Sequence, residues 1–323
     1  HAGYIKRVAL SSYRAQRRGG KGRAGMSTRD EDFVSSVFVC NTHTPVLFFS
    51  SRGIVYKLKV YRLPEGNPQA RGKALINLLP LEEGETITTV MPMPEDEDSW
   101  GDLFILFATA SGGVRRNRLS DFTNIMANGK IAMKLDDGDQ LIGVQTCTED
   151  EDVMLAADSG KSIRFPVTDV RVFSGRTSTG VRGIRLADGQ KIVSMTTLNH
   201  IELETDIRDA YLRMSKAQRR QEGDEDDNGA DEAAEAVNGE NTQIALSEEE
   251  FEKLAETEEF VLSVTENGYG KRTSAYEYRI TKRGGQGVVN ITTEGRNGPV
   301  AASFPVEDSD QIMLVTNGGK IIR

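Results

Sequence analysis

A glycine-centred pattern repeats along this chain and restricts the folds that it can adopt. In each unit, a short apolar run leads through a small-residue turn to glycine, three residues, and then lysine or arginine. Units follow each other at roughly 50 residues, with one longer interval of about 108. The pairs are Gly3/Arg7, Gly53/Lys57, Gly112/Arg116, Gly160/Arg164, Gly268/Arg272 and Gly319/Arg323. The apolar runs are VLFFS (46–50), LFILF (103–107), VMLAA (153–157), FVLSV (260–264) and IMLVT (312–316).

A second pattern, Gly-x-x-x-Met/Ile, follows each of the first five glycines. Its members are Gly22/Met26, Gly72/Ile76, Gly129/Met133, Gly180/Ile184 and Gly287/Ile291. Each unit therefore reads as strand, tight turn, strand, longer loop and strand, since glycine supplies the positive φ that tight turns need. One such unit cannot bury both faces of its small sheet, so neighbouring units must stack. We predict a single all-β domain over residues 1–323, a propeller-like wheel of six blades whose sixth blade is incomplete; an open β-solenoid is the alternative.

The long interval indicates an insertion at 200–259, between the fourth and fifth units. Leu203, Ile207, Tyr211 and Met214 lie at helical spacing in its first part. Its middle is acidic and of low complexity, which is typical of disorder. Ser247 and Glu250 form a capping box near its end. We expect a helix, an unstructured acidic stretch and a short second helix outside the wheel.

The net charge of −9 hides two regions of opposite sign. Residues 221–259 contain 16 acidic residues and one lysine, a net charge of −15, which leaves +6 on the other 284 residues. The body of the protein is therefore basic, as is expected of a nucleic-acid-binding domain. Cys40 and Cys147 match no metal-binding spacing, and with no membrane span or signal peptide in the sequence we expect reduced thiols in a cytosolic protein.

Residues 13–26, YRAQRRGGKGRAGM, form the most basic segment of the chain. Glycines allow the backbone to approach a phosphodiester chain, and the arginines and lysines neutralise phosphates and release counterions. No aromatic residue follows Tyr13 in the segment, which favours contact with a duplex backbone over stacking on single strands. A solvated turn or a localisation signal would also fit this segment taken alone. Its cations are Arg14, Arg17, Arg18, Lys21 and Arg23.

The repeated lysines and arginines predict a basic stripe around the wheel. One set occupies the same position of every unit and consists of Arg7, Lys57, Arg116, Arg164, Arg272 and Arg323. A second set lies nearby and consists of Lys59, Lys73, Lys130, Lys134, Arg182, Lys282 and Arg283. A stripe of this kind would contact phosphates along a duplex. Ordinary solvated strand ends are the alternative.

No arrangement of residues typical of an active site or a metal site stands out. His43 and His200 lack a nearby serine, cysteine or carboxylate arranged as a triad, so both are interpreted as structural or solvated. Asp224, Asp226, Asn228, Gly229 and Glu235 have the spacing of an EF-hand loop, but Asp231 replaces the apolar residue that such a loop needs. We predict no catalytic residue, no metal and no cofactor in this domain.

The segment Gln16–Gly22, QRRGGKG, resembles the GyrA box, the heptapeptide that marks DNA gyrase A subunits. It lies in the loop of the first unit, where that family carries it, and the repeats outside the insertion resemble the blades of the family's C-terminal β-pinwheel. The resemblance implies exchange of strands between neighbouring blades and wrapping of duplex DNA around the rim. It also implies that the box is required for chiral wrapping and negative supercoiling. The implied box residues are Gln16, Arg17, Arg18, Gly19, Gly20, Lys21 and Gly22.

The resemblance places the catalytic parts elsewhere in a larger enzyme. Its cleavage tyrosine, ATP site and magnesium would belong to other regions of an ATP-dependent type II topoisomerase. The implied partners are duplex DNA, bound without sequence preference, and the rest of the gyrase A protein with the gyrase B protein in a heterotetramer. The implied location is the nucleoid-associated cytoplasm of a bacterium. Open alternatives are the equivalent domain of topoisomerase IV, which lacks an intact box, a protein-interaction propeller, and a propeller enzyme with a central site.

Overall fold

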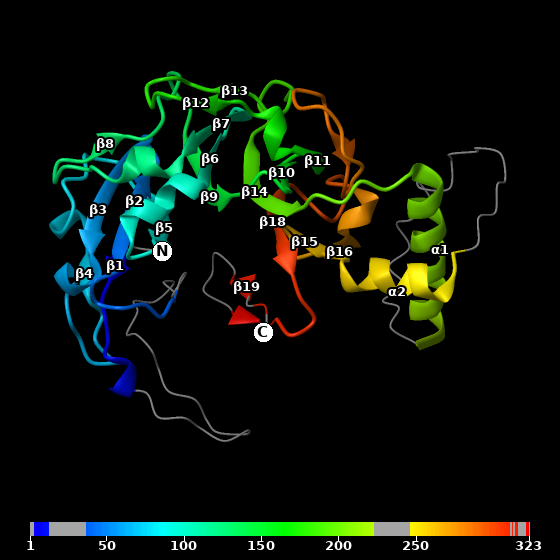
Figure 1. Cartoon of the computed structure of the whole chain (residues 1–323), viewed down its shortest axis with the longest axis horizontal. Coiled ribbons are helices and arrows are strands. Elements are labelled where there is room, and N and C mark those ends of the chain that lie inside the picture. Colours follow the sequence, from blue (N-terminus) through cyan, green and yellow to red (C-terminus); the bar gives the residue numbers. More distant parts are fainter. Residues whose placement is uncertain are drawn as a thin grey trace.

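A row of small antiparallel sheets makes up most of this protein, and the predicted all-β fold is confirmed (Figure 1). The computed structural model describes residues 3–12, 37–222, 246–310, 312, 314–315 and 321–322. The sheets lie side by side in an arc, and in the described part of the chain they do not close into a ring. We call the sheet built on the hairpin of each unit a blade and number the blades by unit.

The strands follow the repeat. Units one and six contribute short strands, β1 (Tyr4–Ile5), β19 (Leu314–Val315) and β20 (Ile321–Ile322). Unit two contains β2 (Pro45–Ser50), β3 (Ile54–Lys59), β4 (Lys73–Ala74) and β5 (Ile87–Pro92). Unit three contains β6 (Phe104–Thr109), β7 (Gly113–Arg118), β8 (Lys130–Ile131) and β9 (Leu141–Cys147). Unit four contains β10 (Glu151–Ala157), β11 (Lys161–Pro166), β12 (Val172–Phe173), β13 (Val181–Arg182) and β14 (Ile192–Asn199). Unit five contains β15 (Phe260–Thr265), β16 (Gly270–Ser274), β17 (Val288–Val289) and β18 (Val300–Val306).

Each of units two to five begins with a tight antiparallel hairpin. The apolar run forms its first strand, which lies between the second hairpin strand and the last strand of the same unit. A one-turn 3₁₀ helix follows each hairpin. These helices are η2 (Val60–Arg62), η5 (Leu119–Phe122), η6 (Val167–Asp169) and η8 (Ala275–Glu277).

Neighbouring blades exchange a short strand. The strand that follows the second glycine of one unit pairs with the hairpin of the preceding unit: β4 pairs with β1, β8 with β3, β13 with β7 and β17 with β11. Each blade is thus completed by the next unit along the chain. The exchange implied by the resemblance to the β-pinwheel is confirmed.

The two glycine patterns mark contacts between consecutive units. Gly160 has a φ of 82°, and a Cβ atom there would collide with the carbonyl oxygen of Ile291, in the second pattern of the next unit. Gly287, with a φ of 72°, in turn lies against the backbone of Ser162 in the preceding hairpin. Only glycine combines this conformation with so close an approach, so most of the repeated glycines mark joints between blades; at Gly3 and Gly268 a Cβ atom would meet no other atom within 4 Å.

The apolar core is divided among the spaces between blades. Four clusters of buried side chains occupy the spaces that join blades one to five. In the cluster between blades two and three, Phe49 packs edge-on against Phe107 and Phe122, with ring centroids 5.8 and 6.2 Å apart. Burial of apolar area between blades is the main stabilising contribution, and it explains why the units must stack.

The blades have an inner and an outer edge. Strands β9, β14 and β18 are neighbours across successive blades, and β5 lies next to β9. The donated strands β8, β13 and β17 lie on the opposite side of their sheets. In Figure 1, β8 and β13 follow the convex side of the arc. Donated strands therefore line the outer perimeter of the protein.

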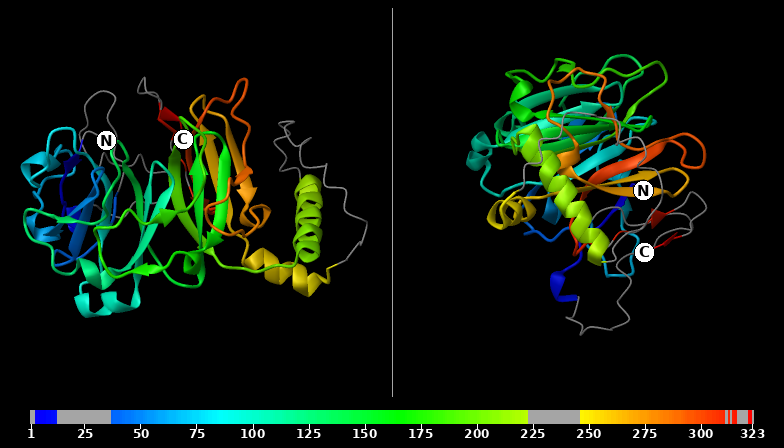
Figure 2. Two further views of the ribbon diagram at one scale, coloured as in Figure 1. Left: turned by 90° about the horizontal axis from the view of Figure 1, so that it is seen from above. Right: turned by 90° about the vertical axis from the view of Figure 1, so that its right-hand side faces the viewer.

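The insertion adds two helices beside blade five, α1 (Thr205–Glu222) and α2 (Glu248–Glu256), at the end of the row of sheets (Figure 2). Tyr211 anchors α1, with its ring 5.4 Å from that of Tyr276 and 5.0 Å from that of Phe251. The predicted capping box of α2 is confirmed, because Ser247 and Glu250 bond reciprocally. Neither α1 nor α2 is long and apolar enough to cross a membrane. Residues 223–245, with the EF-hand-like spacing, lie outside the described residues.

Candidate nucleic-acid interface

The most basic segment of the sequence lies outside the described residues. This applies to the box, Gln16–Gly22, and to Arg14, Arg23 and Arg323. The described cations that were predicted to contact DNA fall into two groups with different surroundings.

The first group, the hairpin cations, consists of Arg7, Lys57, Arg116, Arg164 and Arg272, one from each of units one to five. Every one of them forms an ion pair with a carboxylate. The pairs are Arg7–Glu65 at 2.8 Å, Lys57–Glu97 at 2.5 Å, Arg116–Glu149 at 3.0 Å, Arg164–Asp152 at 2.7 Å and Arg272–Asp308 at 2.5 Å. The shared position in the repeat therefore supplies an ion pair in each of blades one to five.

Arg164 is the most deeply placed of these cations. Its side chain is 3% exposed and its partner Asp152 is fully buried. Its guanidinium also donates to the carbonyl oxygens of Ala275 in unit five and Asn199 in β14, at 2.7 and 2.8 Å. The second carboxylate oxygen of Asp152 lies 2.6 Å from Nδ1 of His200. Arg164 therefore joins blade four to blade five, and His200, interpreted from the sequence as structural or solvated, forms a structural contact with Asp152.

Arg116 is buried in a similar way in blade three. It lies 4.7 Å from the ring centroid of Phe104 and donates from Nε to the carbonyl oxygen of Val170 at 2.7 Å. The prediction that Arg116 and Arg164 lie on a solvent-exposed stripe is wrong. Both side chains are 4% exposed or less, because stacking of the blades covers them.

The second group, the perimeter cations, consists of Lys73, Lys134, Arg182, Lys282 and Arg283. All five are exposed, and none forms an ion pair in the described part of the chain. They lie on the donated strands or in the loops that flank them, at the outer perimeter. Lys59 and Lys130 are partly buried, and Lys130 donates to the carbonyl oxygen of Asn124 at 2.9 Å. Burial lowers the pKa of Lys130, and the nearby charge of Arg176 adds to the shift.

One buried cation was not singled out by the repeat pattern. Arg115 is fully buried and donates to the carbonyl oxygens of Arg176, Ser178 and Ala132 and to the side chain of Asn117. Burial lowers its pKa to about 10, and the charge of Arg176 contributes. It holds the long loop of unit four against blade three without a carboxylate partner among its bonded groups.

The long loops of units four and five meet on the perimeter. The backbone N–H of Gly284 donates to the carbonyl oxygen of Gly183 at 2.6 Å, and Arg185 donates back to Gly285 at 2.7 Å. Arg283 bridges the loops by donating to the carbonyl oxygens of Asp169 and Arg182, at 2.9 and 3.1 Å. Two further exposed cations, Arg185 and Arg279, join the perimeter cations here; neither was predicted from the sequence, although Arg182, Lys282 and Arg283 of the same loops were.

Comparison with known families shows which family this chain belongs to. The family described as "DNA gyrase C-terminal domain, beta-propeller" matches residues 1–41, 44–92, 104–148, 151–199, 259–307 and 310–323, one match for each unit. The chain belongs to this family. Its blades are therefore those of a gyrase A C-terminal domain, and residues 200–258 form no part of the match.

Curated relatives agree with this assignment. The DNA gyrase A subunit of Rickettsia bellii is 51% identical over 321 residues, which are 99% of this chain and 34% of that protein. The DNA gyrase A subunit of Escherichia coli is 38% identical over 323 residues, which are 100% of this chain and 30% of that protein. The chain thus spans about a third of the length of these relatives.

Solved structures show the same fold at low sequence identity. The crystal structure of the C-terminal domain of DNA topoisomerase IV gives a TM-score of 0.70 at 20% identity, covering 99% of this chain and 80% of that one. The structure of a DNA gyrase A C-terminal domain gives 0.61 at 22% identity, covering 99% and 85%. These structures establish the blade architecture.

Proposed function

We propose that this domain binds duplex DNA along its outer perimeter and wraps it, so that DNA gyrase can introduce negative supercoils. The observation that carries the proposal is the row of perimeter cations, exposed and without carboxylate partners in the described residues, on strands and loops of successive blades. Membership of the gyrase C-terminal domain family supports it. Charges spaced along a convex edge suit a bent polyanion better than a compact ligand.

The proposed contacts are to phosphates. Lysine and arginine side chains on an outer edge position a duplex but do not read its bases, so binding is expected to depend weakly on sequence. Curated relatives that are named as DNA gyrase A subunits support a role within a larger enzyme. In that enzyme the rest of the gyrase A protein and the gyrase B protein would supply DNA cleavage and ATP hydrolysis with magnesium, in the bacterial cytoplasm, while this domain would be non-catalytic.

The box, Gln16–Gly22, is the element proposed to fix the path of the DNA. Arg17, Arg18 and Lys21 lie among glycines in the loop of unit one, and perimeter cations of the other blades would supply general affinity. Replacing all three with alanine removes charges from a loop, so little change in thermal stability is expected. DNA binding should weaken in part, and wrapping should fail because the duplex is no longer held at the first blade.

The test uses a complete gyrase that carries the triple substitution. ATP-dependent negative supercoiling should be lost while relaxation and quinolone-induced cleavage persist, because those two activities do not need a wrapped segment. Supercoiling, relaxation and cleavage are measured side by side, with Lys253→Ala in α2 as a charge-removing control. Supercoiling by the triple variant at a rate near wild type would refute the role of the box.

A further inference from the structure

The long loop of blade five repeats the sequence of the box region. Residues 278–287 read YRITKRGGQG, and residues 13–22 read YRAQRRGGKG, with the same residue at six of ten positions. Three glycines and the arginine before them are shared, and Lys282 corresponds to Arg17. The main difference is Gln286, which corresponds to Lys21. Unlike the box, this loop lies within the described residues.

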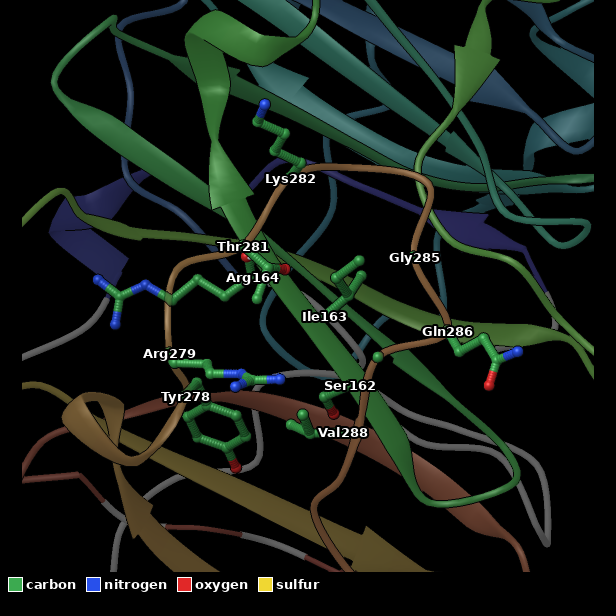
Figure 3. Close-up of a pocket in the computed structure, with 11 residues that line it drawn as sticks. Ser162, Ile163, Arg164, Tyr278, Arg279, Thr281, Lys282, Gly285, Gln286 and Val288 are labelled. Atoms are coloured by element: carbon green, nitrogen blue, oxygen red, sulfur yellow. The ribbon is translucent and has the colours of Figure 1, made fainter. Parts of the chain in front are cut away.

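The blade-five loop arches over β11 and encloses an open cavity of about 240 Å³ (Figure 3). The backbone N–H of Thr281 donates to the carbonyl oxygen of Arg164 at 2.9 Å, which fixes one side of the arch. Gly284 and Gly287 have φ values of 81° and 72°, conformations that other residues rarely adopt. Hydrogen bonds to Gly183 and Arg185 hold the top of the arch against the loop of unit four. The arch is therefore a fixed feature of the perimeter.

One unsatisfied hydroxyl and two exposed cations line this cavity. The hydroxyl of Ser162, a residue 1% exposed, lines it and has no hydrogen-bond partner. Arg279 reaches into the opening in Figure 3, and its side chain makes no hydrogen bond or ion pair with a described residue. Lys282 also lines the rim of the cavity, with its ammonium directed outward. Of the described residues that line the cavity, none is a carboxylate. A buried polar group without a partner is costly unless a ligand satisfies it.

We propose that the blade-five arch holds a backbone phosphate of the duplex as a second box-type contact. This inference rests on the proposed function. Arg279 and the hydroxyl of Ser162 face the phosphate in the opening, and Lys282 reaches its neighbour along the strand. Arg182 and Arg185 of the adjacent loop extend the same positive surface toward blade four. Gln286 leaves this contact one charge weaker than the box.

The test compares variants of the whole domain by fluorescence anisotropy with a duplex of about 40 base pairs at several salt concentrations. Arg279→Ala with Lys282→Ala should lower the slope of log affinity against log salt by about 2, one unit for each lost phosphate contact. Gln286→Lys should raise the slope by about 1. Ser162→Ala should weaken binding without lowering the melting temperature, because the hydroxyl has no partner to lose.

The control removes two charges elsewhere, by Arg213→Ala and Lys253→Ala on the insertion helices, both of which are exposed. It should leave the slope unchanged. A double variant at Arg279 and Lys282 with the slope and affinity of this control overturns the second contact. Failure of the wild-type domain to bind the duplex at any salt concentration would instead refute the proposed function, so the two failures are distinguishable.

Discussion

The hairpin cations and the perimeter cations are the same residue types in opposite surroundings. Hairpin cations recur at one position of every unit, and all five of those described are paired with a carboxylate. Perimeter cations recur less regularly, are exposed, and form no ion pair with a described residue. Regular spacing therefore marks the contacts that build the wheel, and the less regular set is the one that remains available to a polyanion.

A carboxylate within reach decides between the two roles. An arginine already neutralised by aspartate has little charge left to release counterions from DNA, whereas an exposed unpaired one retains all of it. The difference predicts that changes to the two groups separate stability from binding. Changes to the hairpin cations should lower stability, and changes to the perimeter cations should lower DNA affinity.

Salt should have the largest effect, because only the perimeter cations and the box are proposed to contact phosphates. With ~6–10 such contacts, affinity for duplex DNA should fall by roughly 10³–10⁵ between about 50 and 200 mM salt. Titrations at several salt concentrations, with duplexes of unrelated sequence, measure both the slope and the expected indifference to sequence. A flat response would mean that the perimeter cations do not contact phosphates.

Loss of the Arg164 side chain should have the next largest effect, and on stability alone. Arg164→Ala leaves the fully buried Asp152 with only His200 as a side-chain partner, and it removes the guanidinium donor from the carbonyl oxygens of Ala275 and Asn199. Breaking a buried pair in this way costs about 3–5 kcal/mol of unfolding free energy. Urea denaturation monitored by circular dichroism measures the loss.

Arg272 provides the matched control for this change. It occupies the same position of the repeat, but its side chain is 42% exposed and that of its partner Asp308 is 85% exposed. Arg272→Ala should therefore cost no more than about 1 kcal/mol. Equal losses for the two variants would show that burial does not set the strength of the hairpin pairs.

The smallest expected effect is on the pH dependence of stability and involves the partly buried carboxyl group of Glu259. Burial raises the pKa of Glu259 above its ordinary value, opposed by the backbone N–H of Asn199 and by the charge of Arg164. The ionised form is thus penalised in the folded state, so stability should fall as pH rises from the unfolded pKa through the folded one. Glu259→Gln should match wild type in acid and be slightly more stable at neutral pH. Melting temperatures of the two proteins are measured across that pH range. A difference between variant and wild type that does not change with pH would contradict the raised pKa of Glu259.

Much of the fold could be predicted because the repeat is local. The apolar runs of units two to five became the central strands of their blades, and the described glycines of both patterns adopt the positive φ that was expected of them. The capping box of α2 also follows from residues three apart. Unit two differs from units three to five at the second pattern: Ile76 is 60% exposed and Leu75 before it is buried, because the 3₁₀ turn over Leu75–Asn77 presents the preceding side chain to the core.

The sequence by itself determined the number of units, the hairpins and the turns, since these depend on residues close together in the chain. Which cations face solvent was decided only in the tertiary structure. Arg164 meets Asp152 across a hairpin but is buried by unit five, more than a hundred residues away, through Ala275. Arg182 and Arg283 come together because two long loops bond to each other. The sequence does not show which carboxylate a lysine or arginine will pair with, because ion pairing and burial arise only when the blades stack.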